Sequence, residues 1–187
     1  MEWLDIVDEK GNPTGKKVER TKAHREGILH RTSHVWLVRE KQGNIELLLQ
    51  RRSDEKDSYP GCYDISSAGH IPAGCGFLES ALRELLEELG VEAEEEEFIF
   101  CGQRRICHDE YFHGELFKDR QVSNVYYIWK DMEPEQFHIQ QEELSGVRWM
   151  ELNECMRKVC TNEMKHCIAV EELQMLVKTL KEREKTL

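Results

Sequence analysis

Hydrophobic residues alternate with polar residues in several short runs, which is the pattern of strands with one buried face. The first run covers residues 3–7, and a glycine-rich turn at 11–15 returns the chain as a hairpin through residues 16–18. Two clearer runs, at 33–38 and 45–51, flank a Gly-Asn turn and predict a second hairpin. Later strands are predicted at 64–68, 98–107, 122–129 and 147–150.

Apolar residues recur at helical spacing in two segments. The first runs from about residue 78 to residue 89 and is stopped by Gly90. The second is a long amphipathic segment at about 162–184, which predicts a C-terminal helix. Strands and helices therefore alternate along the chain in a mixed order, which indicates the α/β class.

Three carboxylates accompany the first of these helices. Glu84, Glu87 and Glu88 are spaced three and four residues apart, so they share one face of a helix. Like charges this close repel one another unless a cation is present, and carboxylate oxygens suit hard divalent ions such as Mg²⁺ or Mn²⁺. A solvated acidic helix face is the alternative, and the triplet alone does not exclude it.

The segment before the helix favours the metal site. A loop rich in Gly and Pro, residues 69–77, leads directly into the helix. Residues 69–91 together resemble the Nudix box, which reads Gly, five residues, Glu, seven residues, then Arg-Glu-apolar-any-Glu-Glu-any-Gly-apolar. The positions that fall in register are Gly69, Arg83, Glu84, Leu85, Glu87, Glu88, Gly90 and Val91, whereas Cys75 stands at the first Glu of the motif.

The resemblance implies a metal-dependent hydrolase of diphosphate linkages, typically in nucleoside diphosphate derivatives. It implies a Nudix-type α/β/α sandwich with a mixed β-sheet between helices. Glu87 and Glu88 would be metal ligands, Glu84 a ligand or general base, and the carbonyl near Gly69 a further ligand. Such an ion neutralises phosphate oxygens and lowers the pKa of a bound water. Family members often carry an extra acid before a late Trp-containing strand, which makes Glu143 a candidate base or outer ligand, with a surface acid as the alternative.

The departure at Cys75 affects the residue that supports the motif. The family resemblance gives Arg83 a structural role as the partner of the first box Glu, and a neutral thiol is a poor replacement. Glu79 lies one turn before Arg83 at favourable i, i+4 spacing, so we expect it to form the salt bridge instead. A decayed, non-catalytic site is the competing interpretation.

Residues outside the box resemble the isopentenyl diphosphate isomerase branch: His24, His30, Arg51, Arg52, Lys56, the run 59–63, Gly69 and His70. In that isomerase three His and two Glu hold a metal, and a Cys before the Gly-His pair transfers a proton. This chain has Ala68 at the Cys position and Val122 and Asn124 at the carboxylate positions. The resemblance therefore implies an isomerase-like hydrolase rather than an isomerase. His24, His30 and His70 remain a candidate second metal site, with hydrogen-bonded structural histidines as the alternative.

A cationic island precedes the motif. Arg51, Arg52 and Lys56 can contact substrate phosphate, or they can pair with the neighbouring acids 54, 55 and 57. Tyr63 is a candidate to stack on the organic part of a substrate, although aromatic residues at strand ends are more often core.

Composition narrows the class of partner. The net charge of −11 argues against nucleic acid and anionic membranes, and no apolar run is long enough to span a bilayer. Seven Cys without a C-x-x-C motif, and no signal-peptide pattern, indicate a reducing cytoplasm. We expect a single domain at 1–187, with an N-terminal hairpin at about 1–20 and the motif loop and helix at 69–91. Its expected partner is a small-molecule diphosphate, and a homodimer is an assembly that we consider.

Overall fold

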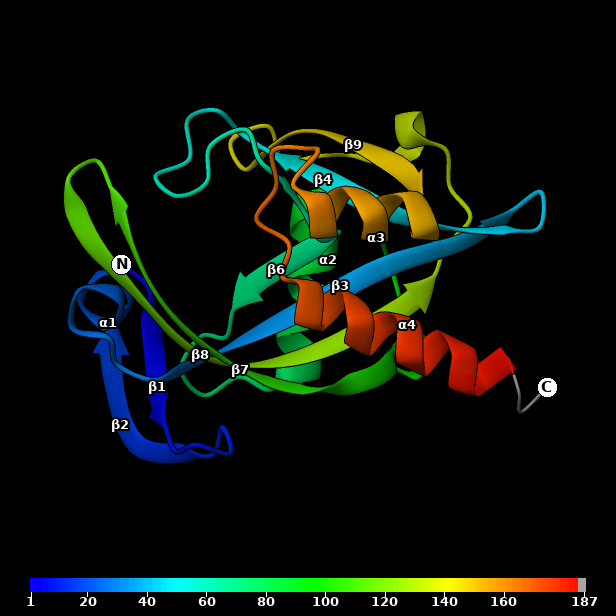
Figure 1. Ribbon diagram of the computed structural model, residues 1–187. Coiled ribbons are helices and arrows are strands. Elements are labelled where there is room, and N and C mark those ends of the chain that lie inside the picture. Colours follow the sequence, from blue (N-terminus) through cyan, green and yellow to red (C-terminus); the bar gives the residue numbers. More distant parts are fainter. Residues whose placement is uncertain (185–187) are drawn as a thin grey trace.

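The computed structural model describes residues 1–184. A two-stranded hairpin, β1 with β2, stands beside a seven-stranded mixed sheet (Figure 1). The strands of the hairpin are β1 (Trp3–Val7) and β2 (Pro13–Glu19). Those of the sheet are β3 (His30–Lys41), β4 (Asn44–Arg52), β5 (Tyr63–Asp64), β6 (Ser67–His70), β7 (Ile99–Phe112), β8 (Glu115–Trp129) and β9 (Leu144–Glu151).

Strand β3 organises the sheet because it changes its neighbour along its length. Its first half pairs with β6 at 32–35, and its second half pairs with β4 at 38–41. On its other side β3 pairs in parallel with β8, and β7 is antiparallel to β8 at the edge. The change of neighbour separates β6 from β4, so the loop that follows β6 leaves the sheet near its centre.

Helices cover both faces of the sheet, because successive residues of β3 point to opposite sides. Val35 and Leu37 pack against α2 (Phe77–Leu89) on one face. Trp36 and Val38 pack in the core on the other face, under α3 (Leu152–Thr161) and α4 (Val170–Glu184). Figure 1 shows α3 and α4 in front of the sheet and α2 behind it. The predicted α/β/α sandwich with a mixed sheet is confirmed.

The predicted helix at 162–184 is wrong in its first part. Asn162 adopts a left-handed conformation, with φ 54°, and ends α3 there. The chain then runs beside β5, where the Tyr63 amide donates to the Lys165 carbonyl at 2.9 Å. Only from Val170 does it form α4, so the helix is shorter than predicted. Helix α3, which ends just before the predicted range, was not predicted.

Helix α1 (Arg20–Glu26) was not predicted. The Glu19 carboxylate accepts hydrogen bonds from the Thr21 and Lys22 amides, both at 3.1 Å, and Gly27 ends the helix in a left-handed conformation. Seven residues give too few apolar positions for a clear helical period. Within residues 1–184 no helix combines the length and the apolar character needed to cross a bilayer.

The β7–β8 hairpin is longer than predicted. Its pairing continues outward to Phe112 opposite Glu115, whereas β3 accompanies β8 only from Gln121 onward. Residues 107–120 therefore form a two-stranded arm that projects beyond the sheet (Figure 1, green). This arm forms one side of the site described below.

Candidate functional site

Helix α2 presents its carboxylates away from the core. Ala81, Leu85 and Leu89 are fully buried against the sheet and fix the rotation of the helix. Glu79 caps its start, because its carboxylate accepts from the Gly76 amide at 3.0 Å. Gly90 ends it with φ 67°. The apolar stripe thus determines which side the glutamates face.

Glu84 lies directly over the backbone of Gly69. A Cβ built at residue 69 would be 2.3 Å from the carboxyl carbon of Glu84, so only glycine leaves space for this side chain. The Glu84 side chain is 19% exposed, and burial raises the pKa of its carboxyl group. The first glycine of the motif therefore brings a carboxylate next to the β6 backbone.

Glu88 is the most deeply buried acid of the cluster. It is 7% exposed, and its Oε2 has no hydrogen-bond partner among the described residues. Burial raises the pKa of Glu88 to about 8. Glu87 differs, because 56% of its side chain is exposed. An unpartnered buried carboxylate beside two others is the arrangement that a bound cation would stabilise.

The loop that carries Glu143 is held against the end of α2. The His138 amide donates to the Leu89 carbonyl, and the Gln140 amide donates to the Glu88 carbonyl, both at 3.0 Å. The negative charge of Glu143 contributes to the raised pKa of Glu88. Glu143 therefore joins the three helix glutamates, as predicted from its place before the late strand.

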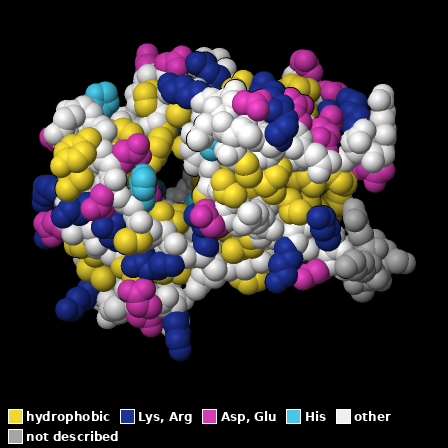
Figure 2. Space-filling view, viewed as in Figure 1, with side chains coloured by type: hydrophobic (Ala, Val, Ile, Leu, Met, Phe, Trp, Pro, Cys, Tyr) yellow, Lys and Arg dark blue, Asp and Glu magenta, His cyan; other side chains and the backbone are white. Residues whose placement is uncertain are grey.

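These acids line one large cleft of about 2130 Å³, which lies between the β7–β8 arm and the body of the molecule (Figure 2). The cleft brings together most of the predicted site residues, although they come from six separate segments. The predicted residues that line it are His24, Arg52, Lys56, Gly69, His70, Glu84, Glu87, Glu88 and Glu143.

Two predicted substrate-binding residues do not line the cleft, and both assignments are corrected. The Arg51 guanidinium pairs with Asp54 at 3.0 Å and donates to Ser145 at 2.9 Å. The ring of Tyr63 packs under the guanidinium of Arg148, 4.2 Å from its carbon, on the side of the sheet away from α2. Local pairing thus explains Arg51, and core packing explains Tyr63.

The other two cations of the island face the cleft. Lys56 donates to the Glu143 carboxylate, a partner that lies far from it in the sequence. Arg52 donates to the Ser58 carbonyl at 2.9 Å and lies 3.5 Å from Asp64. Neither forms the predicted local pair with residues 54, 55 or 57 among these contacts.

The prediction that Glu79 supports Arg83 is wrong. Glu79 is occupied as the cap of α2, so its carboxylate points back to Gly76. Arg83 instead donates to Glu84 at 2.5 Å and lies 3.8 Å from Glu87. Arg83 therefore contacts the proposed metal ligands themselves, because no acid at position 75 attracts it elsewhere.

The motif loop is supported by a buried ion pair that sequence reasoning missed. Arg31 donates to the Asp5 carboxylate and to the Cys75 carbonyl, both at 3.0 Å. The same Asp5 oxygen accepts from the Gly74 amide at 2.8 Å. Asp5 inside the apolar run at 3–7 was the available signal, since such charged residues are rarely buried unless they are paired.

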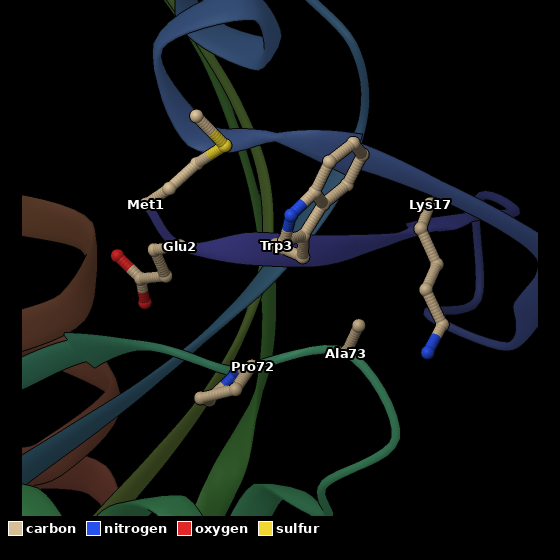
Figure 3. A pocket seen from close by; sticks show the side chains of 6 residues that line it. All are labelled: Met1, Glu2, Trp3, Lys17, Pro72 and Ala73. Carbon is tan, nitrogen blue, oxygen red and sulfur yellow. The ribbon is translucent and has the colours of Figure 1, made fainter.

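A smaller hollow of about 660 Å³ lies where β1 meets the motif loop (Figure 3). The Ala73 amide donates to the Trp3 carbonyl at 2.8 Å, which fastens this hairpin to the loop. The hollow has a single carboxylate, from Glu2, so it offers no comparable cluster. It is lined by Met1, Glu2, Trp3, Lys17, Pro72 and Ala73.

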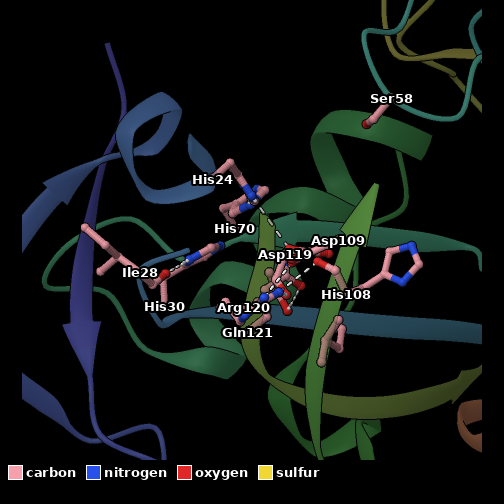
Figure 4. Close-up of polar contacts among 12 residues, drawn as sticks. His24, Ile28, His30, Ser58, His70, His108, Asp109, Asp119, Arg120 and Gln121 are labelled. Carbon is pink, nitrogen blue, oxygen red and sulfur yellow. Dashed lines mark hydrogen bonds and ion pairs between the residues drawn. The ribbon is translucent and has the colours of Figure 1, made fainter. Parts of the chain in front are cut away.

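At the arm end of the large cleft three histidines meet (Figure 4). One ring nitrogen from each of His24, His30 and His70 lies within 4.8 Å of the others. The Nε2 atoms of His24 and His70 are 3.0 Å apart. His24 Nδ1 and His30 Nε2 have no hydrogen-bond partner among the described residues. Burial lowers the pKa of His24 to about 3, so the neutral rings keep lone pairs that a metal ion can use.

Asp119 lies beside this cluster and comes from the β7–β8 arm. Its Oδ1 is 3.7 Å from Nδ1 of His24, and burial raises its pKa to about 6. Sequence reasoning placed the missing carboxylates at Val122 and Asn124 and overlooked an acid three residues earlier. The length of the arm, which the sequence did not reveal, brings Asp119 back to the histidines.

Comparison with known proteins identifies the family of this chain. A family model described as the NUDIX domain matches residues 28–169. Nudix hydrolase 3 of Arabidopsis thaliana is 41% identical over 157 residues, which are 82% of this chain and 20% of that protein. An uncharacterized Nudix hydrolase of Clostridium acetobutylicum is 36% identical over 156 residues, which are 83% of this chain and 73% of that protein.

Solved structures share the fold. A protein of Deinococcus radiodurans matches with a TM-score of 0.68 at 22% identity and covers 92% of this chain and 98% of its own. The NUDIX domain of Shewanella oneidensis NrtR, solved with ADP ribose, matches with a TM-score of 0.56 at 17% identity, covering 89% and 99%. The Ap4A hydrolase of C. elegans in a binary complex matches with a TM-score of 0.54 at 18% identity, covering 81% and 98%.

The family match includes the sheet, the motif loop and α2 with its glutamates, and these are the parts that form the cleft. The chain belongs to the Nudix family of hydrolases.

Proposed function

We propose that this protein is a Mg²⁺-dependent hydrolase that cleaves a diphosphate linkage in a nucleoside diphosphate derivative or a related organic diphosphate, with Mn²⁺ as an alternative ion. The observation that supports it most is the convergence of Glu84 and Glu88 beside Gly69, with one oxygen of Glu88 buried and unpartnered. Oxygen donors of this kind suit Mg²⁺.

The residues present fit such an ion. Glu84, Glu87 and Glu88, with the Gly69 carbonyl, would hold it, and a cation would offset the burial that raises the pKa of Glu88. When bound, the ion neutralises phosphate oxygens and acidifies a coordinated water. Deprotonation of Glu88 is then favoured, so loading the site releases a proton near neutral pH.

The remaining residues of the cleft have roles in binding and proton transfer. Arg52 and Lys56 face the cleft and would donate charge-assisted hydrogen bonds to the diphosphate. Glu143 is paired with Lys56, and release of that pair by an incoming phosphate would free its carboxylate as a general base. Glu84 is the alternative base, because it lies closest to the β6 backbone.

A true isomerase is the alternative activity. The three histidines and the run 59–63 support an isomerase-like branch within the family, yet Ala68 has no group that can transfer a proton. Val122 is buried and cannot hold a metal. A non-catalytic diphosphate-binding protein is a further alternative, which the substitution at Cys75 favours.

One experiment separates these functions. The full chain is incubated with Mg²⁺ and a panel of diphosphates that includes ADP ribose and diadenosine tetraphosphate, and new phosphate ends are quantified. Metal-dependent cleavage of at least one compound is expected, with no solvent deuterium entering isopentenyl diphosphate. Deuterium incorporation at a catalytic rate establishes the isomerase, and binding without cleavage of any compound establishes the non-catalytic protein.

We further propose one domain throughout the chain, a cytoplasmic location and small-molecule rather than nucleic-acid or membrane partners. Seven cysteines that all remain thiols support a reducing compartment. A homodimer stays a proposal, to be checked by light scattering.

The Cys75→Glu variant is expected to need several-fold less Mg²⁺ for half-maximal activity. A carboxylate at residue 75 would attract Arg83, whose guanidinium otherwise pairs with Glu84 and Glu87 and competes with the ion for them. Titration of activity with Mg²⁺ measures this effect. Cys75→Gln is the matched control without the charge, and equal Mg²⁺ requirements in both variants would contradict the competition.

The three histidines are proposed as a second metal site. Imidazole nitrogens suit Zn²⁺ and similar ions. Protein dialysed against Zn²⁺ is expected to retain one equivalent by elemental analysis, and His70→Ala is expected to lose it. Glu87→Gln should keep it, since that residue belongs to the other cluster. Retention of the ion by His70→Ala would exclude this site.

A further inference from the structure

A row of paired residues crosses the sheet from the proposed metal site to its far edge. His70 on β6 pairs with Thr32 on β3, Thr32 pairs with Ser123 on β8, and Ser123 pairs with Arg104 on β7. Neighbouring strands are about 4.8 Å apart, so Arg104 lies roughly 14 Å across the sheet from the β6 backbone. Three members of this row line the large cleft: His70, Thr32 and Arg104.

At the far end of this row, Glu172 of α4 is surrounded by donors. Its carboxylate accepts from His34 Nδ1 at 2.8 Å and from Trp36 Nε1 at 3.1 Å. It also accepts from Arg104 at 2.7 Å. Three segments distant in the sequence therefore meet at one carboxylate.

Charge and hydrogen bonding couple the members of this cluster. Burial alone would raise the pKa of Glu172, but the charge of His34 and the hydrogen bonds from His34 and Arg104 lower it to about 2. The same carboxylate outweighs the effect of burial on His34 and raises its pKa, and the charge of Asp64 contributes. Two basic side chains thus share the carboxylate of Glu172.

All three side chains line the cleft, and the two basic ones are more exposed than the carboxylate. The side chains of Arg104 and His34 are 17% and 14% exposed, whereas that of Glu172 is 2% exposed. A structural ion pair needs only one cation, and a second one beside an accessible cleft costs solvation energy unless an anion joins it. Arg104 retains guanidinium donors beyond the one used by Glu172, and its planar group suits phosphate.

We propose that Arg104 and His34 bind a phosphoryl group of the substrate that is remote from the diphosphate being cleaved. This inference rests on the proposed hydrolase function and narrows its substrate class to organic diphosphates that carry a further phosphate. The distance across the sheet separates this group from the diphosphate at Glu84 and Gly69. Glu172 acts as a positioning residue, because it lies at the cleft with only 2% of its side chain exposed and holds both basic side chains.

Binding of matched ligands tests the proposal. NADP⁺ with NAD⁺, and coenzyme A with dephospho-coenzyme A, are two pairs that differ by one phosphate away from the diphosphate. Their dissociation constants are measured by calorimetry with Mg²⁺ in the Glu87→Gln background, where turnover is not expected to consume them. In at least one pair the phosphate-bearing member should bind about tenfold tighter or more, as charge-assisted hydrogen bonds provide.

Variants of Arg104 test whether this residue causes the preference for the phosphate-bearing ligand. Arg104→Gln should abolish it, and Arg104→Lys should retain part of it, since the charge and the pair with Glu172 remain. Arg105→Gln is the matched control: it removes a cation from the same strand that pairs with Glu9 instead. Thermal melting checks that each variant is folded.

Two results would overturn the proposal. One is equal affinity within both pairs of ligands when Arg104 is intact, and the other is a preference that survives Arg104→Gln. Absence of binding by all four ligands would overturn it too. The measurement needs no cleavage, so a failure of the proposed hydrolase activity, detected in the panel assay, is distinguishable from a failure of this phosphate site.

Discussion

The kcat of the Glu87→Gln variant is expected to fall about 10³-fold. A loss of this size is typical when a group that stabilises charge in the transition state is removed. The substitution keeps the size of the side chain and removes only the negative charge that would hold the metal ion. More than half of this side chain is exposed at the cleft, so the core under α2 stays unchanged. Steady-state hydrolysis of the best diphosphate in the panel measures the effect.

Glu92→Gln is the matched control for this prediction. It removes the same charge from an exposed position three residues after the end of α2, outside the cleft. Its kcat should stay within about twofold of the parent, as for a surface substitution that touches no site. Comparable activity in Glu87→Gln and the parent, at equal melting temperatures, would remove Glu87 from the site.

The substitution Glu172→Gln is expected to lower the free energy of unfolding by about 3 kcal/mol at pH 7 relative to the parent protein. It removes one partner of a buried ionic network. Glutamine can accept fewer hydrogen bonds from the donors of His34, Trp36 and Arg104 and carries no charge to compensate them. Urea denaturation of both proteins measures the difference.

This loss should depend on pH in a defined direction. The pKa of Glu172 is about 2 in the folded protein, below the value of 4.5 for an ordinary glutamate. The folded state therefore binds this proton less tightly than the unfolded state, so the contribution of the carboxylate is fully present above pH 4.5. It decreases as the pH falls towards 2, and the difference between the parent and Glu172→Gln should shrink over that interval.

Glu171→Gln provides the control, because it alters the preceding and exposed residue of α4. Its effect on unfolding should stay within about 0.5 kcal/mol, the usual range for surface substitutions. A Glu172→Gln protein as stable as Glu171→Gln would show that the network does not stabilise the fold.

The local chemistry of the motif was readable from the sequence. The apolar stripe through Leu85 and Leu89 determines the rotation of α2, and the 3.6-residue period then places Glu84, Glu87 and Glu88 together. The order of strands and helices likewise predicted the α/β class, whereas the family resemblance implied the α/β/α sandwich. Both inferences depend only on neighbours within a few turns or on the regular alternation of a strand.

Partners of charged side chains were decided by the tertiary structure. Spacing along the helix predicted Glu79 for Arg83, but the amide of Gly76 offered Glu79 a nearer donor. Phosphate contact and a pair with a local acid were the two alternatives for Lys56, which instead meets Glu143, brought close by the loop at the end of α2. Helical spacing states which pairs are within reach, and competition among all nearby groups selects one.

Sites assembled from distant segments were also beyond the sequence. The histidine cluster was suggested only by family resemblance, and Asp119 joins it through the length of the β7–β8 arm. Glu172 meets Arg104 and His34 because of the strand order. Strand β8 lies between β3, which carries His34, and β7, which carries Arg104, and α4 packs across this part of the sheet. The sequence by itself determined the motif helix, the shared face of its three glutamates and the α/β class, because these follow from local periodicity. Strand pairing determined the rest, because it joins residues whose separation along the chain carries no periodic signal.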